Sequence, residues 1–430
     1  MLRILNITAQ KPDSTGSGVF LAETVRAFAS LGCEQAVIAG IGPDDDPRFP
    51  EGVLFCPVRF EIPALPFPVV GMSDEMPYRA TRYRDLTPEM LERFYAAFNE
   101  ALDKVLACFR PDLVLCHHLY LVCALTAHRD WDVPVVGISH STDIRQMRRI
   151  PLERAYVRKG VARLSGIFAL HGQQKEDIVE TYGVAPERVV VMGTGYNDRV
   201  FHRIEGLRQP DGANLVYAGK VWRKKGVPSL LRAVDALTDD EGNILSATGD
   251  GMCGMTGAVP FGAAASDAHL AGRHLRLRLA GGYSNRTDYE RIVAQASACH
   301  ADIAFLGRLP QEDLARAYNE ADVFVLPSFF EGLPLVVVEA LACGCKVVVT
   351  DLPGIRPWLS ANVPAAPVRY VAPPRMRDVD EPDPDDLPHF ETDLAKAIRA
   401  SLADPVRPCA VSHLSWEGLC RRMLDWVRLR

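Results

Sequence analysis

A chain of 430 residues exceeds the ~250–300 residues that one hydrophobic core usually serves, so two domains are expected. Its net charge of −6 argues against a general nucleic-acid binder, and no apolar run approaches the ~18–20 residues that span a bilayer. The 11 cysteines form no Cys-x-x-Cys pair, and the N-terminus lacks the pattern of a secretory signal. We therefore expect a reduced, cytoplasmic protein.

The first half of the chain alternates short apolar runs with helical patterns. A helix is predicted from about Gly18 to Leu31, because its apolar residues recur every three or four positions and Gly32 follows as a stop signal. The predicted strands are Leu2–Ile7, Gln35–Ala39, Leu113–Cys116, Pro134–Ser139, Gly166–Leu170 and Arg188–Met192. Such alternation is typical of a parallel sheet with helices on both faces.

The alternation begins again at Asn214. The second set of predicted strands is Asn214–Ala218, Leu275–Ala280, Ala304–Leu306, Val323–Leu326 and Lys346–Thr350. The helices between them are predicted at Val227–Leu237, Thr287–Ser297, Gln311–Asn319 and Pro334–Ala342. Two series predict two doubly wound α/β domains, 1–200 and 201–410, and a final helix within 411–430 that can pack on either domain.

Two stretches interrupt the alternation. Residues 239–272 are rich in glycine and alanine and indicate an inserted surface loop. Residues 373–388 are acidic and rich in proline, so a mobile excursion is expected there.

Four segments lie beyond the carboxyl ends of predicted strands, where open parallel sheets bind their ligands. They are Gly16-Ser17-Gly18, His117-His118, His140-Ser141-Thr142-Asp143 and Gly219-Lys220. In the first of them, small residues at the start of a helix let a phosphate or sugar approach backbone N–H groups. The alternatives are a tight turn and a dinucleotide fingerprint, although Leu21 stands at the third glycine position of that fingerprint.

Residues 219–226 carry four cations in a strand-to-helix turn: Lys220, Arg223, Lys224 and Lys225. A solvated turn is the simplest interpretation. At the carboxyl edge of a sheet, however, such lysines can neutralise a diphosphate leaving group, and each well-placed donor contributes ~3–4 kcal/mol in a transition state.

The segment Phe329–Ala340 combines a helix start with two carboxylates. Pro334 suits the first turn of a helix, which leaves the N–H groups of Leu335 and Val336 as an anion site. Glu331 precedes the helix, and Glu339 lies inside an otherwise apolar run, where a carboxylate needs partners. Sugar and ribose hydroxyls would satisfy them. The alternatives are a salt bridge for Glu339 and a helix-dipole partner for Glu331.

The histidines at strand ends and a basic segment complete the candidates. His118 is either an acceptor-side residue or a packed core histidine. Residues 145–163 contain seven basic residues and one acid, which is typical of a solvated helix face. The functional hypothesis for this segment is contact with an anionic acceptor or an anionic membrane.

These residues resemble the retaining glycosyltransferase family 4, which has the GT-B fold of two Rossmann-like domains facing each other across a cleft. Glu331 and Glu339 match its E-x7-E motif, and Gly219-Lys220 with Lys225-Gly226 is similar to its G-R-x4-K-G turn. Ile138-Ser139-His140 resembles the strand that ends in its acceptor-side histidine. Lys220 stands where the family has arginine, which keeps the charge but loses the bidentate fork.

The resemblance implies a role for each matching residue. Lys220, Lys225 and the amides of Leu335 and Val336 would hold the donor diphosphate, with the Gly16-Ser17-Gly18 loop nearby. Glu339 would bind the ribose, and Arg308-Leu309 would meet the base. His140, Glu331 and Lys225 would surround the transferred sugar, with His118 and Asp143 on the acceptor side.

The resemblance further implies a reaction that needs neither metal nor cofactor. A hexosyl unit would pass from a UDP- or GDP-sugar to a glycan, a lipid-linked or a small-molecule acceptor, with no nucleic-acid partner. The alternatives are a nucleotide-sugar epimerase of the same fold, an NAD-dependent dehydrogenase and a catalytically silent binding subunit.

Overall fold

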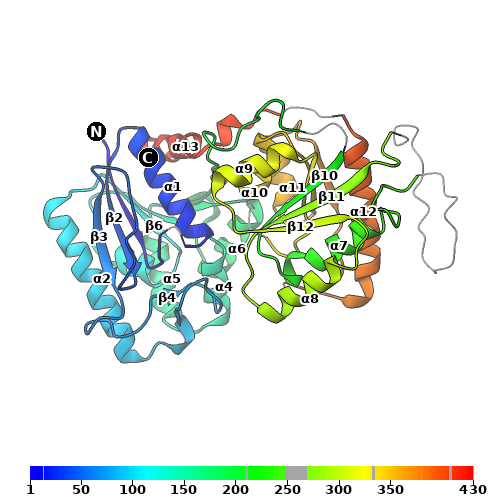
Figure 1. Cartoon of the computed structure of the whole chain (residues 1–430). Helices are drawn as coiled ribbons and strands as arrows, with labels where there is room; N and C mark the ends of the chain where they lie inside the picture. The colour runs from blue at the N-terminus through cyan, green and yellow to red at the C-terminus, as the bar shows by residue number, and fades with distance from the viewer. Residues whose placement is uncertain are drawn as a thin grey trace. The chain divides into compact units, whose positions relative to one another are not determined.

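The computed structural model describes residues 1–12, 14–208, 212–246, 269–331, 335–378, 380–405 and 409–429. The chain forms two compact units, Met1–Gly195 with Leu414–Arg430, and Tyr196–His413. Each unit is built around a large parallel sheet with helices packed against it (Figure 1). The prediction of two parallel-sheet α/β domains is therefore confirmed.

The sheet of the first unit has seven strands in the order β3-β2-β1-β6-β7-β8-β9, all paired in parallel. The strands are β1 (Arg3–Thr8), β2 (Glu34–Ile41), β3 (Leu54–Arg59), β6 (Leu113–His117), β7 (Val135–Ile138), β8 (Gly166–Ala169) and β9 (Val189–Val191). The strand order reverses between β1 and β6, which places a topological switch point at their carboxyl ends. The edge strand β3 was not predicted, because its side chains are mostly half-exposed and Pro57 interrupts its apolar run.

The helices of this unit connect and cover the sheet. They are α1 (Gly16–Ser30), α2 (Pro88–Cys108), α3 (Leu121–His128), α4 (Thr142–Arg149), α5 (Arg154–Arg163), α6 (Gly172–Tyr182) and α13 (Trp416–Arg428). Shorter elements are β4 (Val70–Gly71), β5 (Thr81–Arg82), η1 (Tyr83–Asp85) and η2 (Pro186–Arg188), and η5 (Ser412–Leu414) lies where the chain passes from the second unit back to the first. Helix α1 begins two residues earlier than predicted, because Thr15 caps it and accepts a hydrogen bond from the Gly18 N–H at 3.1 Å.

The last helix, α13, packs on the first unit (Figure 1). Trp416 meets Phe20 of α1 edge to face, with 5.1 Å between the ring centroids. Trp426 covers Gly166 so closely that a Cβ there would lie 2.0 Å from the indole ring. The sequence left the position of this helix open, and two tryptophans decide it by burying their rings against the N-terminal domain.

The sheet of the second unit has six strands in the order β12-β11-β10-β13-β14-β15, again all parallel. The strands are β10 (Gly212–Ala218), β11 (His274–Ala280), β12 (Asp302–Gly307), β13 (Val323–Leu326), β14 (Lys346–Thr350) and β15 (Val368–Val371). The helices are η3 (Arg223–Lys225), α7 (Val227–Asp235), α8 (Arg286–Ala296), α9 (Gln311–Glu320), α10 (Leu335–Ala342), α11 (Ile355–Asn362) and α12 (Leu387–Ala403). Here the strand order reverses between β10 and β13.

The two irregular stretches have different outcomes. Most of the expected insertion, residues 247–268, lies outside the described residues. The expected excursion at 373–388 was wrong in part, because it contains the antiparallel strands β16 (Met376–Asp378) and β17 (Glu381–Pro382), followed by η4 (Pro384–Asp386). In the described part of the chain, no helix combines the length and apolarity that crossing a membrane requires.

Candidate active site

In the second unit, the loops that follow β10, β11 and β12 lie against one another. The Gly219 N–H donates to the carbonyl of Ala280 at 2.9 Å, and the Gly281 N–H donates to the carbonyl of Gly307 at 2.7 Å. A Cβ on Gly281 would lie 1.7 Å from the carbonyl oxygen of Gly219. Because only glycine permits this approach, the backbones at the carboxyl ends of these strands form one continuous edge.

The cationic turn is fixed by Gly226. This residue has φ +68°, and a Cβ on it would lie 1.9 Å from the carbonyl oxygen of Pro327 at the end of β13. The turn is therefore pressed against the loop after β13. This packing brings Lys225 close to residues that are far away in the sequence.

Lys225 and Glu331 form an ion pair with 2.7 Å between Nζ and Oε1. The ammonium group also donates to the carbonyl of Phe330 at 3.2 Å. Both side chains are largely shielded from solvent, with 25% and 16% of their surfaces exposed. The structure thus brings together two of the three side chains that the sequence assigned to the reacting centre.

The remaining cations of the turn divide into two groups. Arg223 faces Asp288 and Glu381 at 3.7 and 3.6 Å, and Lys224 pairs with Asp380 at 2.9 Å. Lys220, in contrast, lies beside the indole ring of Trp222, with 5.2 Å from Nζ to the ring centroid. Acidic side chains therefore engage Arg223 and Lys224, as Glu331 engages Lys225, whereas Lys220 lies against an aromatic ring.

Helix α10 begins at Leu335, and Leu335 and Val336 are half-buried in its first turn. The loop prediction for Gly332 and Pro334 falls outside the described residues. Glu339 is 9% exposed on this helix. Its charge adds to burial, the main cause, in raising the pKa of the neighbouring Tyr318 hydroxyl far above the usual range.

Arg308 and Leu309 follow β12 at the same sheet edge. Gly307 has φ +65° and turns the chain, and the exposed side chain of Arg308 lies over Gly282. A Cβ on Gly282 would come within 2.6 Å of Arg308 Nε. The glycine thus leaves room for a guanidinium beside the end of β11.

In the first unit, Gly16, Ser17 and Gly18 form the first turn of α1. Neither glycine has positive φ, so the alternative of a left-handed tight turn does not hold. A Cβ added to Gly16 would meet no described residue within 4 Å. Packing against the described residues therefore leaves open space beside the backbone at Gly16.

Three histidines, His117, His118 and His140, form a cluster at the carboxyl ends of β6 and β7. The rings of His117 and His140 stack, and 3.3 Å separate Nδ1 of His117 from Nε2 of His140. Phe20 packs edge-on against both rings. Burial lowers the pKa of His140 to about 3 and holds the pKa values of His117 and His118 well below their usual range. All three imidazoles are therefore neutral at physiological pH.

His118 stands out within this histidine cluster. It is 3% exposed and has φ +67°, a conformation that non-glycine residues seldom adopt. Neither of its ring nitrogens has a hydrogen-bond partner in the described part of the chain. An unsatisfied buried polar group of this kind costs ~1–3 kcal/mol, so a hydroxyl-bearing ligand that supplied the missing partner would be favoured.

Asp143 ties the loops of the histidine cluster together. Its Oδ2 accepts a hydrogen bond from the Leu119 N–H at 2.8 Å, and its Oδ1 accepts from the Ser139 hydroxyl at 3.0 Å and the His140 N–H at 3.2 Å. The side chain is fully buried, and burial raises the pKa of the carboxyl against the opposing effect of these hydrogen bonds. This geometry suits a residue that positions the histidines.

Sequence reasoning missed several neighbours of these residues. Phe20 lies two residues after the glycine loop and packs on the histidine cluster, and Trp222 lies between Lys220 and Lys224. Asp380 pairs with Lys224 from the segment that the sequence set aside as an excursion. The signal for Trp222 was present within the cationic turn, whereas the pairing of Asp380 depends on how the chain folds back.

Comparisons with known proteins find glycosyltransferase domains in this chain. Residues 14–200 match the family model of Glycosyltransferase Family 4, and residues 256–376 match that of the glycosyl transferases group 1. The chain is an enzyme that transfers a glycosyl group.

Particular relatives agree with this assignment. The D-inositol 3-phosphate glycosyltransferase of Streptomyces bingchenggensis is 25% identical over 366 residues, which are 80% of this chain and 71% of the relative. Sucrose-phosphate synthase from Thermosynechococcus elongatus matches 100% of this chain and 99% of its own, with TM-score 0.63 and 17% identity. Anabaena Alr3699/HepE, solved in complex with UDP and glucose, matches 100% of both chains with TM-score 0.60 and 12% identity. The structural matches show that the fold is GT-B.

Proposed function

We propose that the enzyme transfers a hexosyl unit from a UDP- or GDP-sugar with retention at the anomeric carbon. The observation that carries this proposal is the meeting of Lys225, Glu331 and the edge formed by Gly219 and Gly281 in one unit. Cations at the carboxyl ends of parallel strands suit a diphosphate. The complex of Anabaena Alr3699/HepE with UDP and glucose supports a donor of this class.

Donor binding rearranges the charges around Lys225 in this proposal. In the structure, its ammonium group is compensated by Glu331. A diphosphate carries more negative charge than one carboxylate, so it attracts Lys225 and Lys220 and leaves Glu331 available to the hydroxyls of the sugar. The amides of Leu335 and Val336 contribute at the start of α10, and Glu339 holds the ribose.

The acceptor hydroxyl then attacks the anomeric carbon. A bond forms between the acceptor oxygen and this carbon as the bond to the diphosphate oxygen breaks, and the acceptor proton passes to the departing phosphate. The bound cations stabilise the negative charge that develops on the leaving group. His140 hydrogen-bonds the sugar as a neutral imidazole, and Asp143 positions it.

A phosphorylated acceptor is consistent with the names of two similar proteins, D-inositol 3-phosphate glycosyltransferase and sucrose-phosphate synthase. Contact of residues 145–163 with an anionic membrane receives less support, because much of this basic segment is engaged within its own unit. The engaged residues are Arg148, Arg154, Arg158 and Arg163. A membrane contact through this segment therefore rests on few charges.

Thermal-shift measurements with UDP, GDP and their sugars test the donor. A ligand at about 100 times its Kd stabilises the folded state by ~2.7 kcal/mol, so the correct nucleotide raises the Tm. Glu339→Ala should weaken nucleotide binding, whereas Lys225→Ala should lower kcat more than affinity. Lys396→Ala is a matched control, because it removes an ion-paired lysine from helix α12. Unchanged kinetics in both site variants would refute the assignment.

Two further measurements test the chemistry. Activity should persist in excess EDTA, and loss of activity that magnesium restores would contradict the metal-independent mechanism. Incubation of the donor without acceptor distinguishes a transferase from an epimerase of the same fold, because only the epimerase rearranges its donor alone.

A further inference from the structure

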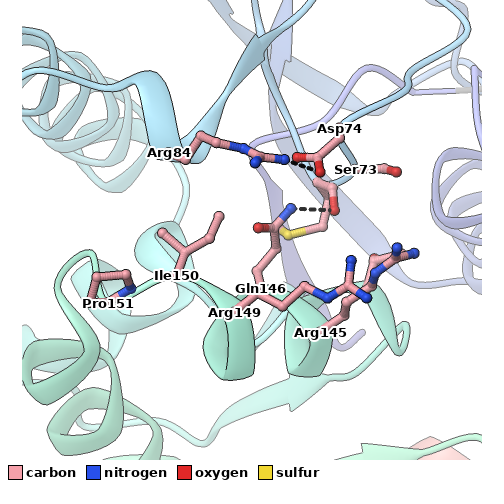
Figure 2. A pocket seen from close by; sticks show the side chains of 10 residues that line it. Ser73, Asp74, Arg84, Arg145, Gln146, Arg149, Ile150 and Pro151 are labelled. Atoms are coloured by element: carbon pink, nitrogen blue, oxygen red, sulfur yellow. Dashed lines mark hydrogen bonds and ion pairs between the residues drawn. The ribbon is translucent and has the colours of Figure 1, made fainter. Parts of the chain in front are cut away.

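A cavity of about 250 Å³ lies in the first unit between helix α4 and the chain segments around Ser73 and Arg84. Arg145, Gln146 and Arg149 come from the helix, and Arg84 extends from the opposite side of the cavity to Asp74 (Figure 2). Gln146 spans the two walls, since its Nε2 donates to the carbonyl of Met72 at 2.8 Å. The wall opposite the helix is therefore held in place by a side chain of the helix itself.

The cavity is strongly positive. Three arginines line it, and Asp74 is the one acidic residue among its lining residues. Arg84 is paired with Asp74, whereas Arg145 and Arg149 have no ion pair with any residue that the structure describes. Arg148 of the same helix differs, because it pairs with Asp177 at 2.9 Å and Glu180 at 2.8 Å. Arg145 and Arg149 thus share one cavity in which the single carboxylate, Asp74, is paired with Arg84.

This cavity adjoins the histidine cluster. Thr142 lines it and begins α4, two residues after His140, whose N–H donates to Asp143 Oδ1. The opposite wall is attached to the end of β1 by the buried Gln10, whose Nε2 donates to the carbonyl of Val70 at 2.7 Å and whose Oε1 accepts from the Met72 N–H at 3.2 Å. An anion in the cavity would therefore lie at the carboxyl edge of the sheet, beside the proposed sugar-binding histidine.

We infer that this cavity binds the phosphate group of the acceptor, so that the enzyme glycosylates a phosphorylated acceptor. The inference rests on the proposed function for its place in the reaction. Two unpaired guanidinium forks match a doubly charged phosphate, whereas a single carboxylate would leave one of them uncompensated. The volume lies just below the ~300–1,000 Å³ of typical small-molecule sites, which suits a phosphate and the sugar or polyol that carries it.

The phosphate can belong to a soluble sugar phosphate or to a lipid headgroup, and calorimetric titrations distinguish these sources. The probes are glucose 6-phosphate, glucose, inorganic phosphate, and vesicles of phosphatidylcholine with or without phosphatidylglycerol, all at constant ionic strength. The test variant is Arg145→Gln with Arg149→Gln. The matched control is Arg48→Gln with Arg110→Gln, two exposed arginines of the same unit outside the cavity.

We expect a phosphate-bearing probe to bind the wild-type enzyme, and glucose not to bind. The double cavity variant should weaken that binding roughly tenfold or more, because two charge-assisted contacts are lost, while the control stays within about twofold. If the variant is poorly folded, Arg145→Lys with Arg149→Lys keeps the charges and should retain part of the affinity. If the enzyme binds anionic vesicles but none of the soluble phosphates, and the cavity variant weakens this binding, the phosphate belongs to a lipid headgroup.

The inference is overturned if neither phosphates nor anionic vesicles bind, or if the control loses as much affinity as the cavity variant. UDP and GDP titrations keep this result separate from the proposed function. Nucleotide affinity should be the same in the wild type and in Arg145→Gln with Arg149→Gln. If no nucleotide binds to either protein, the donor assignment fails whatever the phosphate result.

Discussion

Replacing Asp143 with asparagine tests whether this residue positions the histidine cluster. One carboxylate oxygen of Asp143 accepts from the Leu119 N–H, and the other accepts from the Ser139 hydroxyl and the His140 N–H. An asparagine keeps one acceptor oxygen, and its NH₂ group must take the place of the other. At least one buried donor therefore loses its partner and meets another donor. The loss of one buried partner costs ~1–3 kcal/mol.

The assay is thermal unfolding combined with kinetics. A loss of ~1–3 kcal/mol lowers the Tm of a domain of this size by roughly 2–12 °C, at ~2–4 °C for each kcal/mol. We also expect kcat to fall, because the backbone of His140 loses its anchor. Ser139→Ala is the matched control, since it removes one neutral donor and leaves both backbone bonds to Asp143 intact. The reasoning would be refuted by an Asp143→Asn variant with wild-type Tm and wild-type kcat.

Two other predictions concern pH and glycine. The histidines of the cluster have folded-state pKa values below their unfolded values, so the unfolded state binds more protons once the pH falls below about 6.5. Above about pH 6.5 the full stability is present. As the pH falls below that value, each histidine lowers the free energy of unfolding by up to ~1.4 kcal/mol for each pH unit. The loss ends at the pKa of the histidine in the folded state, which is about 3 for His140. Urea midpoints at pH 7.5 and 5.5 should show this loss, and a flat profile would contradict neutral burial. Gly226→Ala should destabilise the protein by at least ~1–3 kcal/mol, because its φ is positive and its Cβ would collide with the carbonyl of Pro327. Gly16→Ala should leave the Tm unchanged and weaken donor binding, and equal Tm values for the two alanine variants would contradict this contrast.

Most of the fold could be predicted from the sequence. The strands β13 and β14 have the predicted bounds, because each is a continuous apolar run between polar residues. Strands β3 and β15 were missed, and each lies partly buried at the edge of its sheet, although the edge strands β9 and β12 were predicted. Edge strands carry a weaker hydrophobic pattern than central ones.

The candidate site could be predicted as a set of strand-end segments. Lys220, Lys225 and His140 were chosen because strand ends are visible as places where apolar runs stop. The partners of these residues were not visible. Phe20 lies on a helix face that also serves the core, and Asp380 lies in an acidic segment without apolar periodicity.

By itself the sequence determined two parallel-sheet domains, the segments at their strand ends and the resemblance to a glycosyltransferase family. These properties depend on local patterns, because hydrophobic periodicity and turn residues act over a few neighbouring positions. Only the tertiary structure decided that Lys225 meets Glu331 across 106 positions, that α13 packs on the first unit, and that Arg84 faces α4 across a cavity. Such contacts depend on strand order and on the directions of side chains, which no short stretch of residues specifies.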